Sequence, residues 1–131
     1  MLQVVYQGFK FSQVTNLADF YKTNLPEMSK IRSLVEGIKL LFGIPQTNLL
    51  IEVAEGERVY KITLLSSDVH KYPFGYFVYL PLERRLDAYT MDNPEIPLLQ
   101  WKNKKPVFKG FSMFLDRAGV STIFDKLVNV I

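Results

Sequence analysis

The chain has 131 residues, a length that fits one globular domain and leaves little room for a second. Its apolar share of 48% supports a real core, and the lack of cysteine excludes disulfides, thiolate metal sites and a cysteine nucleophile. The net charge of +3 is smaller than a dedicated nucleic-acid domain usually carries. We therefore predict one domain over residues 1–131.

The N-terminal segment predicts a strand followed by a short helix. Apolar side chains in Leu2–Phe11 fall on both faces of an extended chain, as in a strand. The polar residues that follow are typical of a turn, and Asn16 or Thr15 can cap a helix that runs to about Asn24. This segment lacks a basic start and a small-residue cleavage site, so it is not a signal peptide, and a cytoplasmic location is expected.

The second predicted helix has the strongest local pattern in the chain. Apolar residues recur at spacings of three and four from Met28 to Phe42, which gives the helix one apolar face. Pro26 suits the first turn of such a helix, where no intrahelical N–H bond is lost. Gly43 supplies a left-handed stop, and Pro45 prevents continuation.

Beyond Pro45 the apolar period changes from 3.6 to 2, which predicts strands. The first two strands are joined by the turn Glu55-Gly56-Glu57, and the next two by the turn Pro81–Arg84. A polar loop, Ser66–Pro73, separates the two hairpins. The predicted strands are Thr47–Ala54, Arg58–Leu65, Phe74–Leu80, Arg85–Met91, Ile96–Trp101 and Val107–Leu115.

The C-terminal segment returns to helical spacing and ends at Ile131, with Asp116 or Ser121 as its cap. Long helices do not alternate with strands, so a doubly wound parallel sheet is not expected. The sequence predicts an α+β fold: a mostly antiparallel, twisted sheet of about six to seven strands, with two N-terminal helices and one C-terminal helix.

The residue combinations that mark most enzymes are missing. His70 is the only histidine, so zinc sites and serine–histidine triads lack their usual components, and no phosphate-binding glycine loop is present. We therefore predict no catalytic residue, metal or cofactor, and no stretch approaches the roughly 18 apolar residues of a membrane span. Converging carboxylates remain as a third hypothesis, although acids on strands are expected to face solvent. The candidate carboxylates are Glu52, Glu57, Asp87 and Glu95.

Aromatic residues concentrate around the predicted strand Phe74–Leu80. Alternation places apolar residues on both faces of this strand, and Arg58–Leu65 shows the same pattern. Because a chain with three helices has limited means to cover a sheet twice, a protein partner or a second copy is expected to cover one face. The residues assigned to this partner surface are Tyr72, Phe74, Tyr76, Tyr79, Arg84 and Arg85.

A second candidate surface lies near the lysine-rich turn. From Ile96 to Leu115 the chain has four lysines and no acid, so this segment carries the whole positive excess. Lysines interleaved with aromatic rings are typical of single-strand nucleic-acid binding, where cations follow phosphates and rings stack on bases. A hairpin with buried rings and solvated lysines explains the same pattern. The candidate residues are Trp101, Lys102, Lys104, Lys105, Phe108 and Lys109.

The leading hypothesis is a small non-enzymatic protein that binds another macromolecule, as an inhibitor, adaptor or immunity-type binder does. This hypothesis rests on the predicted sheet with apolar residues on both faces and on the missing catalytic groups. Compact domains of this kind are common products of phages and mobile elements. A protein partner or a homodimer is the first expectation, nucleic acid is the alternative, and no membrane partner is expected.

Overall fold

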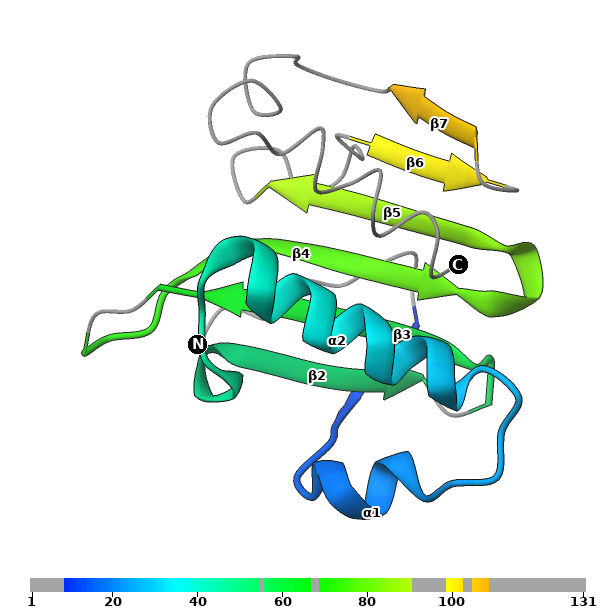
Figure 1. Cartoon of the computed structure of the whole chain (residues 1–131), viewed down its shortest axis with the longest axis horizontal. Coiled ribbons are helices and arrows are strands. Elements are labelled where there is room, and N and C mark those ends of the chain that lie inside the picture. The colour runs from blue at the N-terminus through cyan, green and yellow to red at the C-terminus, as the bar shows by residue number, and fades with distance from the viewer. Residues whose placement is uncertain (1–8, 55, 67–68, 91–98, 103–104, 109–131) are drawn as a thin grey trace.

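The computed structural model describes residues 9–54, 56–66, 69–90, 99–102 and 105–108 of the chain. These residues form an antiparallel sheet with two helices on one of its faces (Figure 1). The predicted α+β class, the antiparallel sheet and the two N-terminal helices are confirmed. The predicted strands and helices do not match one for one, and the predicted C-terminal helix ending at Ile131 lies outside the described residues.

The strands of the sheet lie side by side in the order in which they occur in the chain, and each neighbouring pair is antiparallel. From β2 to β5 this meander arises because short connections join consecutive strands, and short connections require antiparallel pairing. The strands are β1 (Ser12–Gln13), β2 (Leu49–Ala54), β3 (Val59–Leu65), β4 (Pro73–Leu80), β5 (Arg85–Thr90), β6 (Leu99–Lys102) and β7 (Lys105–Phe108).

Both predicted helices are present, but the first ends at Tyr21 rather than near Asn24, and the second begins at Met28, after Pro26. The side chain of Asn16 accepts a hydrogen bond from the Asp19 amide at 3.1 Å and caps α1 (Leu17–Tyr21). The longer helix, α2 (Met28–Phe42), ends at Gly43, whose φ of 61° is the left-handed conformation expected there. Two 3-10 turns, η1 (Gln46–Asn48) and η2 (Pro81–Glu83), precede β2 and β5.

The first strand differs from the prediction. Residues 9–11 are not in a strand, and Leu2–Gly8 lie outside the described residues. The strand β1 instead falls in the polar stretch, where Ser12 and Gln13 pair with Val53 and Glu52 of β2. Both β1 side chains are exposed. The pairing is made by the backbone, so periodicity of apolar side chains does not reveal it.

The last hairpin also differs from the prediction. Its turn is shorter than predicted, because Lys102 and Lys105, predicted to lie in the turn, pair with each other as strand residues. Pro106 lies inside β7 and pairs with Trp101, although proline usually ends strands. In the sheet as described, β7 is an edge strand, where a missing N–H donor costs no ladder hydrogen bond.

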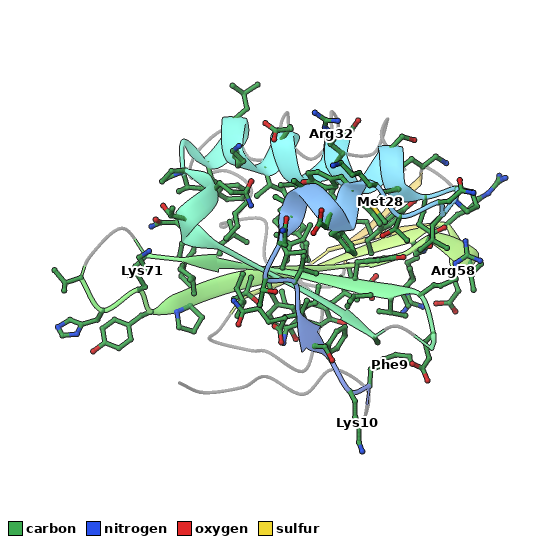
Figure 2. All side chains as sticks on the ribbon, turned by 90° about the horizontal axis from the view of Figure 1, so that it is seen from below. Phe9, Lys10, Met28, Arg32, Arg58 and Lys71 are labelled. Atoms are coloured by element: carbon green, nitrogen blue, oxygen red, sulfur yellow. The ribbon has the colours of Figure 1, made fainter. Side chains whose placement is uncertain are left out.

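Buried side chains lie on both faces of the sheet. On one face, α2 crosses β2, β3 and β4 (Figure 1) and packs its apolar stripe on residues such as Ile51, Ile62 and Phe77. The opposite surface, which we call the far face, holds a second cluster that includes Val59, Tyr76, Val78, Leu80 and Tyr89. Figure 2 shows Met28 and Arg32 of α2 on one side of the sheet and Phe9 on the other.

Candidate interaction surface

The loop between β3 and β4, together with the start of β4, presents a group of exposed apolar side chains. Val69 is 95% exposed, Tyr72 is 61% exposed and Phe74 is 41% exposed. With His70 and Lys71, also exposed, these residues form a projection that we call the β3–β4 tip. Monomeric proteins seldom gather apolar side chains in solvent without a binding role. The tip is therefore the leading candidate for an interaction surface among the described residues.

Hydrogen bonds close the base of this loop. The Ser66 amide donates to the Tyr72 carbonyl oxygen at 2.8 Å, and the Tyr72 amide donates to Ser66 Oγ at 2.9 Å. The His70 and Tyr72 rings lie 5.5 Å apart at their centroids. Both backbone groups of Tyr72 are thus held by Ser66, which fixes where the exposed tyrosine ring leaves the chain.

The segment before β2 fixes the same loop from the side. Buried Asn48 donates from Nδ2 to the carbonyl oxygens of Leu65 and Ser66, at 3.3 Å and 2.8 Å. Lys71 adopts a left-handed conformation with φ of 50°, and its Nζ donates to the Thr47 carbonyl oxygen at 3.1 Å. The tip is therefore an anchored loop, and ordering it on binding requires little loss of conformational entropy.

Two residues assigned to the partner surface from sequence are buried. Tyr76 belongs to the far face, where its ring stacks on Tyr89 with centroids 4.6 Å apart. Tyr79 packs under α2 beside Tyr60, and burial together with the Glu27 carboxylate raises the pKa of Tyr79 to about 12. Both tyrosines belong to the core of the chain, which corrects their assignment to an exposed surface.

The two arginines assigned to that surface lie far from the tip. Tyr72 precedes β4, whereas Arg84 and Arg85 follow it, so the length of an eight-residue strand, roughly 26 Å, separates them. Arg84 is exposed and has a left-handed φ of 50°. The Arg85 guanidinium faces Asp87 at 3.1 Å. The sequence analysis assigned Tyr72 and the two arginines to one surface, whereas in the structure they lie beyond opposite ends of β4.

A cleft of about 400 Å³ lies at the end of the sheet where these arginines are found. It runs between the β2–β3 turn and the β4–β5 turn, and we call it the turn-end cleft. Its lining combines apolar side chains of the far face with charged residues of the two turns. The lining residues are Phe9, Gly56, Glu57, Arg58, Val59, Leu80, Leu82, Glu83 and Arg85.

One wall of the cleft is fixed by a buried carboxylate. Glu27, at the N-cap position of α2, accepts hydrogen bonds from Nε and Nη2 of Arg58 and from the Tyr60 hydroxyl, the first and last at 2.8 Å. The Arg58 hydrogen bonds lower the pKa of the Glu27 carboxyl to about 2, so it is ionised at neutral pH. Arg58 is thereby held in the left-handed conformation, with φ of 53°.

The strand carboxylates considered as catalytic candidates do not converge. Asp87 is buried, which corrects the expectation that it faces solvent, and it pairs with Arg85. Glu52 pairs with buried Lys61 at 3.7 Å. Since β2 and β5 are three strand spacings apart, the backbones of these two acids are separated by roughly 14 Å. Glu57 is exposed beside the cleft, and Glu95 lies outside the described residues.

Between these two acids lies an unusual lysine. Lys61 is buried on the far face, with its Nζ 5.3 Å from the ring centroids of both Phe11 and Tyr76. Burial lowers its pKa, and the Glu52 carboxylate opposes that shift. Cation–π contacts and one carboxylate together stabilise the ammonium in this setting. The far face is therefore a packed layer with internal charge pairs.

Part of the candidate nucleic-acid surface falls on described strands. Trp101 and Lys102 belong to β6, and Lys105 and Phe108 belong to β7. In register, Trp101 pairs with Leu86, and Lys102 pairs with Arg85. Lys104 and Lys109 lie outside the described residues. The nucleic-acid assignment stays a prediction.

The described residues contain no group of three histidine, cysteine, aspartate or glutamate side chains placed to hold a metal ion. None of the helices described is long and apolar enough to cross a membrane. Comparisons of the chain with protein-family models, with curated proteins and with solved structures gave no match.

Proposed function

We propose that the chain is a small, non-enzymatic, cytoplasmic protein that binds another protein through the β3–β4 tip. The observation that carries the proposal is the exposure of Val69 and Tyr72 on a loop anchored by hydrogen bonds, with exposed Phe74 beside them at the start of β4. Tyrosine is enriched at binding hot spots because its ring buries a large area and its hydroxyl still finds a partner. An anchored loop adds to this by lowering the entropy lost on binding.

The remaining features of the described residues favour binding over catalysis. Glu52 pairs with Lys61 of the neighbouring strand, and Asp87 pairs with Arg85 of its own strand. The two acids lie on separate strands, so they are poorly placed for acid–base work on one substrate. The exposed apolar residues of the tip need no such convergence, because burial of apolar area against a partner provides the free energy of binding.

Affinity capture from lysate of the native host tests this proposal. The baits are the parent chain, the double variant Val69→Ser/Tyr72→Ser and the control variant Leu40→Ser. Leu40 is 83% exposed on α2, so the control removes a comparable apolar group elsewhere. Thermal unfolding of the three baits verifies that all are folded. Capture is done in parallel with nuclease-treated and untreated lysate.

We expect a protein that the parent and Leu40→Ser retain and the double variant loses, in both lysates. Equal capture by all three baits would contradict a role for the tip. Capture that disappears after nuclease treatment would instead favour the nucleic-acid alternative through the lysine-rich hairpin.

A further inference from the structure

We propose that Asn48 is a positioning residue for the β3–β4 tip. From a buried position at the base of the loop it holds the tip in one conformation, and it thereby sets how tightly the tip binds a partner. This inference rests on the proposed function, because it takes the tip as the binding surface. It adds a residue that controls binding without contact, since Asn48 is only 5% exposed.

The pairing of β2 with β3 explains why this residue acts through its side chain. Leu49, the first residue of β2, pairs with Leu64, so the preceding residue stands opposite Leu65. Asn48 is the last residue of η1, and its backbone N–H donates to the Pro45 carbonyl oxygen at 3.0 Å instead of extending the ladder. Its Nδ2 group takes over this role by donating to the Leu65 carbonyl oxygen at 3.3 Å.

The hydrogen bonds continue from Asn48 to the exposed tyrosine of the tip. Nδ2 of Asn48 also donates to the Ser66 carbonyl oxygen at 2.8 Å. Ser66 in turn holds both backbone groups of Tyr72, through its own amide and its Oγ. The position of the Tyr72 ring is therefore set, through Ser66, by a side chain from the segment that precedes β2.

The contacts of Asn48 require an amide rather than a carboxylate of the same size. The Thr47 hydroxyl donates to Asn48 Oδ1 at 3.4 Å, so the amide oxygen faces Thr47 and the amide nitrogen faces the two carbonyl oxygens. At pH 7 an aspartate side chain is ionised and only accepts hydrogen bonds. It would place a negative charge against the carbonyl oxygens of Leu65 and Ser66.

A second contact ties the outer part of the tip to the same 3-10 turn. Lys71 Nζ donates to the Thr47 carbonyl oxygen at 3.1 Å. Figure 1 shows the β3–β4 loop and the segment from α2 to β2 at the same end of the sheet. A loop held in its bound conformation loses less entropy on binding, and the apparent affinity falls with the fraction of chains in which the loop is open.

The test compares Asn48→Ala and Asn48→Asp with the parent and with the matched control Gln46→Ala. Gln46 belongs to the same 3-10 turn, and within the described part of the chain its amide side chain makes no hydrogen bond. Amide hydrogen exchange is followed by NMR. Exchange of the Tyr72 amide reports opening of the tip, whereas exchange of the Ile62 amide, in the inner strand β3, reports unfolding of the sheet.

Exchange of the Tyr72 amide should be about tenfold faster in Asn48→Ala, which lacks the donor, than in the parent. It should be faster still in Asn48→Asp, because the carboxylate repels both carbonyl oxygens. The Tyr72 rate should change by a larger factor than the Ile62 rate, and Gln46→Ala should match the parent. A side chain that only filled space would give the reverse order, because alanine leaves a void and aspartate leaves none.

The same four chains then serve as baits for lysate of the native host. The amount of a protein that the parent and Gln46→Ala both retain should fall by about twofold or more with Asn48→Ala, and further with Asn48→Asp. Thermal unfolding verifies that the baits are folded. Asn48→Ala carries no charge, so it keeps the test decisive if the carboxylate of Asn48→Asp prevents folding.

Equal Tyr72 exchange in the parent and both Asn48 variants would overturn the inference, and so would a more open tip in Asn48→Ala than in Asn48→Asp. Faster exchange with unchanged capture would overturn it too, while the captured protein would still support the proposed function. A parent bait that retains no protein would contradict the proposed function, and the exchange rates would still decide whether Asn48 holds the tip.

Discussion

Three cationic residues, Arg58, Lys71 and Arg84, adopt the left-handed conformation with φ of 53°, 50° and 50°. For a residue with a Cβ this conformation costs roughly 1–2 kcal/mol, so its occurrence requires compensation from contacts or from turn geometry. Arg58 is compensated by the buried Glu27 carboxylate, and Lys71 by the Thr47 carbonyl oxygen. Arg84 is an exposed residue at the end of η2.

Glycine substitution should therefore have opposite effects at two of these positions. Arg84→Gly relieves the backbone strain and is expected to be neutral or to stabilise the fold by up to about 1 kcal/mol. Arg58→Gly leaves the buried Glu27 without its cation and should destabilise the fold by about 2 kcal/mol or more. Urea denaturation of both variants measures the difference. Equal shifts of the two midpoints in the same direction would contradict this account.

At the scale of elements, Glu27 connects the start of α2 to the β2–β3 turn and to β3. Its partners, Arg58 and Tyr60, come from the turn and from the strand that follows it. Glu27 and Arg58 are 31 residues apart in sequence, and their contact joins the start of the helix to the hairpin. The sequence showed Glu27 only as an acid near a helix start, where it favours the dipole.

This connection predicts a dependence of stability on pH. The pKa of Glu27 is lowered from 4.5 to about 2 in the fold, so the ionised form binds more strongly than the neutral form. Its contribution is complete above pH 4.5 and is lost as the pH falls from 4.5 toward 2. The loss should be on the order of 3 kcal/mol.

The measurement is the free energy of unfolding from urea denaturation at a series of pH values. Glu27→Gln should be less stable than the parent at pH 7, and the difference should shrink steadily below pH 4.5. Glu36→Gln, at an exposed position of the same helix, is the matched control and should follow the parent. A constant difference between parent and Glu27→Gln at all pH values would show that Glu27 does not titrate as described.

At the scale of the whole molecule, the sheet is packed on both faces. The core beneath α2 and the far-face cluster share β3, β4 and β5, and along β4 successive residues from Tyr76 to Leu80 contribute to the two clusters in turn. A change in one cluster is therefore transmitted through strands common to both, and we predict that the two unfold together as a single domain.

The variant Ile38→Ala tests this coupling. Ile38 is buried where α2 meets the sheet, and its truncation should destabilise the fold by about 2–5 kcal/mol. Far-UV circular dichroism follows α2, and near-UV circular dichroism follows aromatic pairs such as Tyr76 and Tyr89 of the far face. Both signals should shift to the same lower temperature. Separate transitions would contradict a single cooperative domain.

Local sequence determined the helices and strands in which apolar side chains recur at a regular spacing. Alternation predicted β2 to β5 within a few residues, and the apolar stripe with Gly43 predicted α2 and its end. It also predicted that β3 and β4 carry apolar residues on both faces, and their burial confirms this. These features follow from side-chain pattern and from the backbone freedom of glycine, which are local properties.

Tertiary structure alone decided which of these residues meet. The pairing of β1 with the edge of β2, the contact of Glu27 with Arg58 and the burial of Asp87 depend on residues distant in sequence. The same holds for the candidate surface. Tyr76 and Tyr79 are aromatic like Tyr72, but strand packing buries them and leaves the loop residue exposed. Composition and period cannot separate these tyrosines, because exposure depends on what the rest of the chain covers.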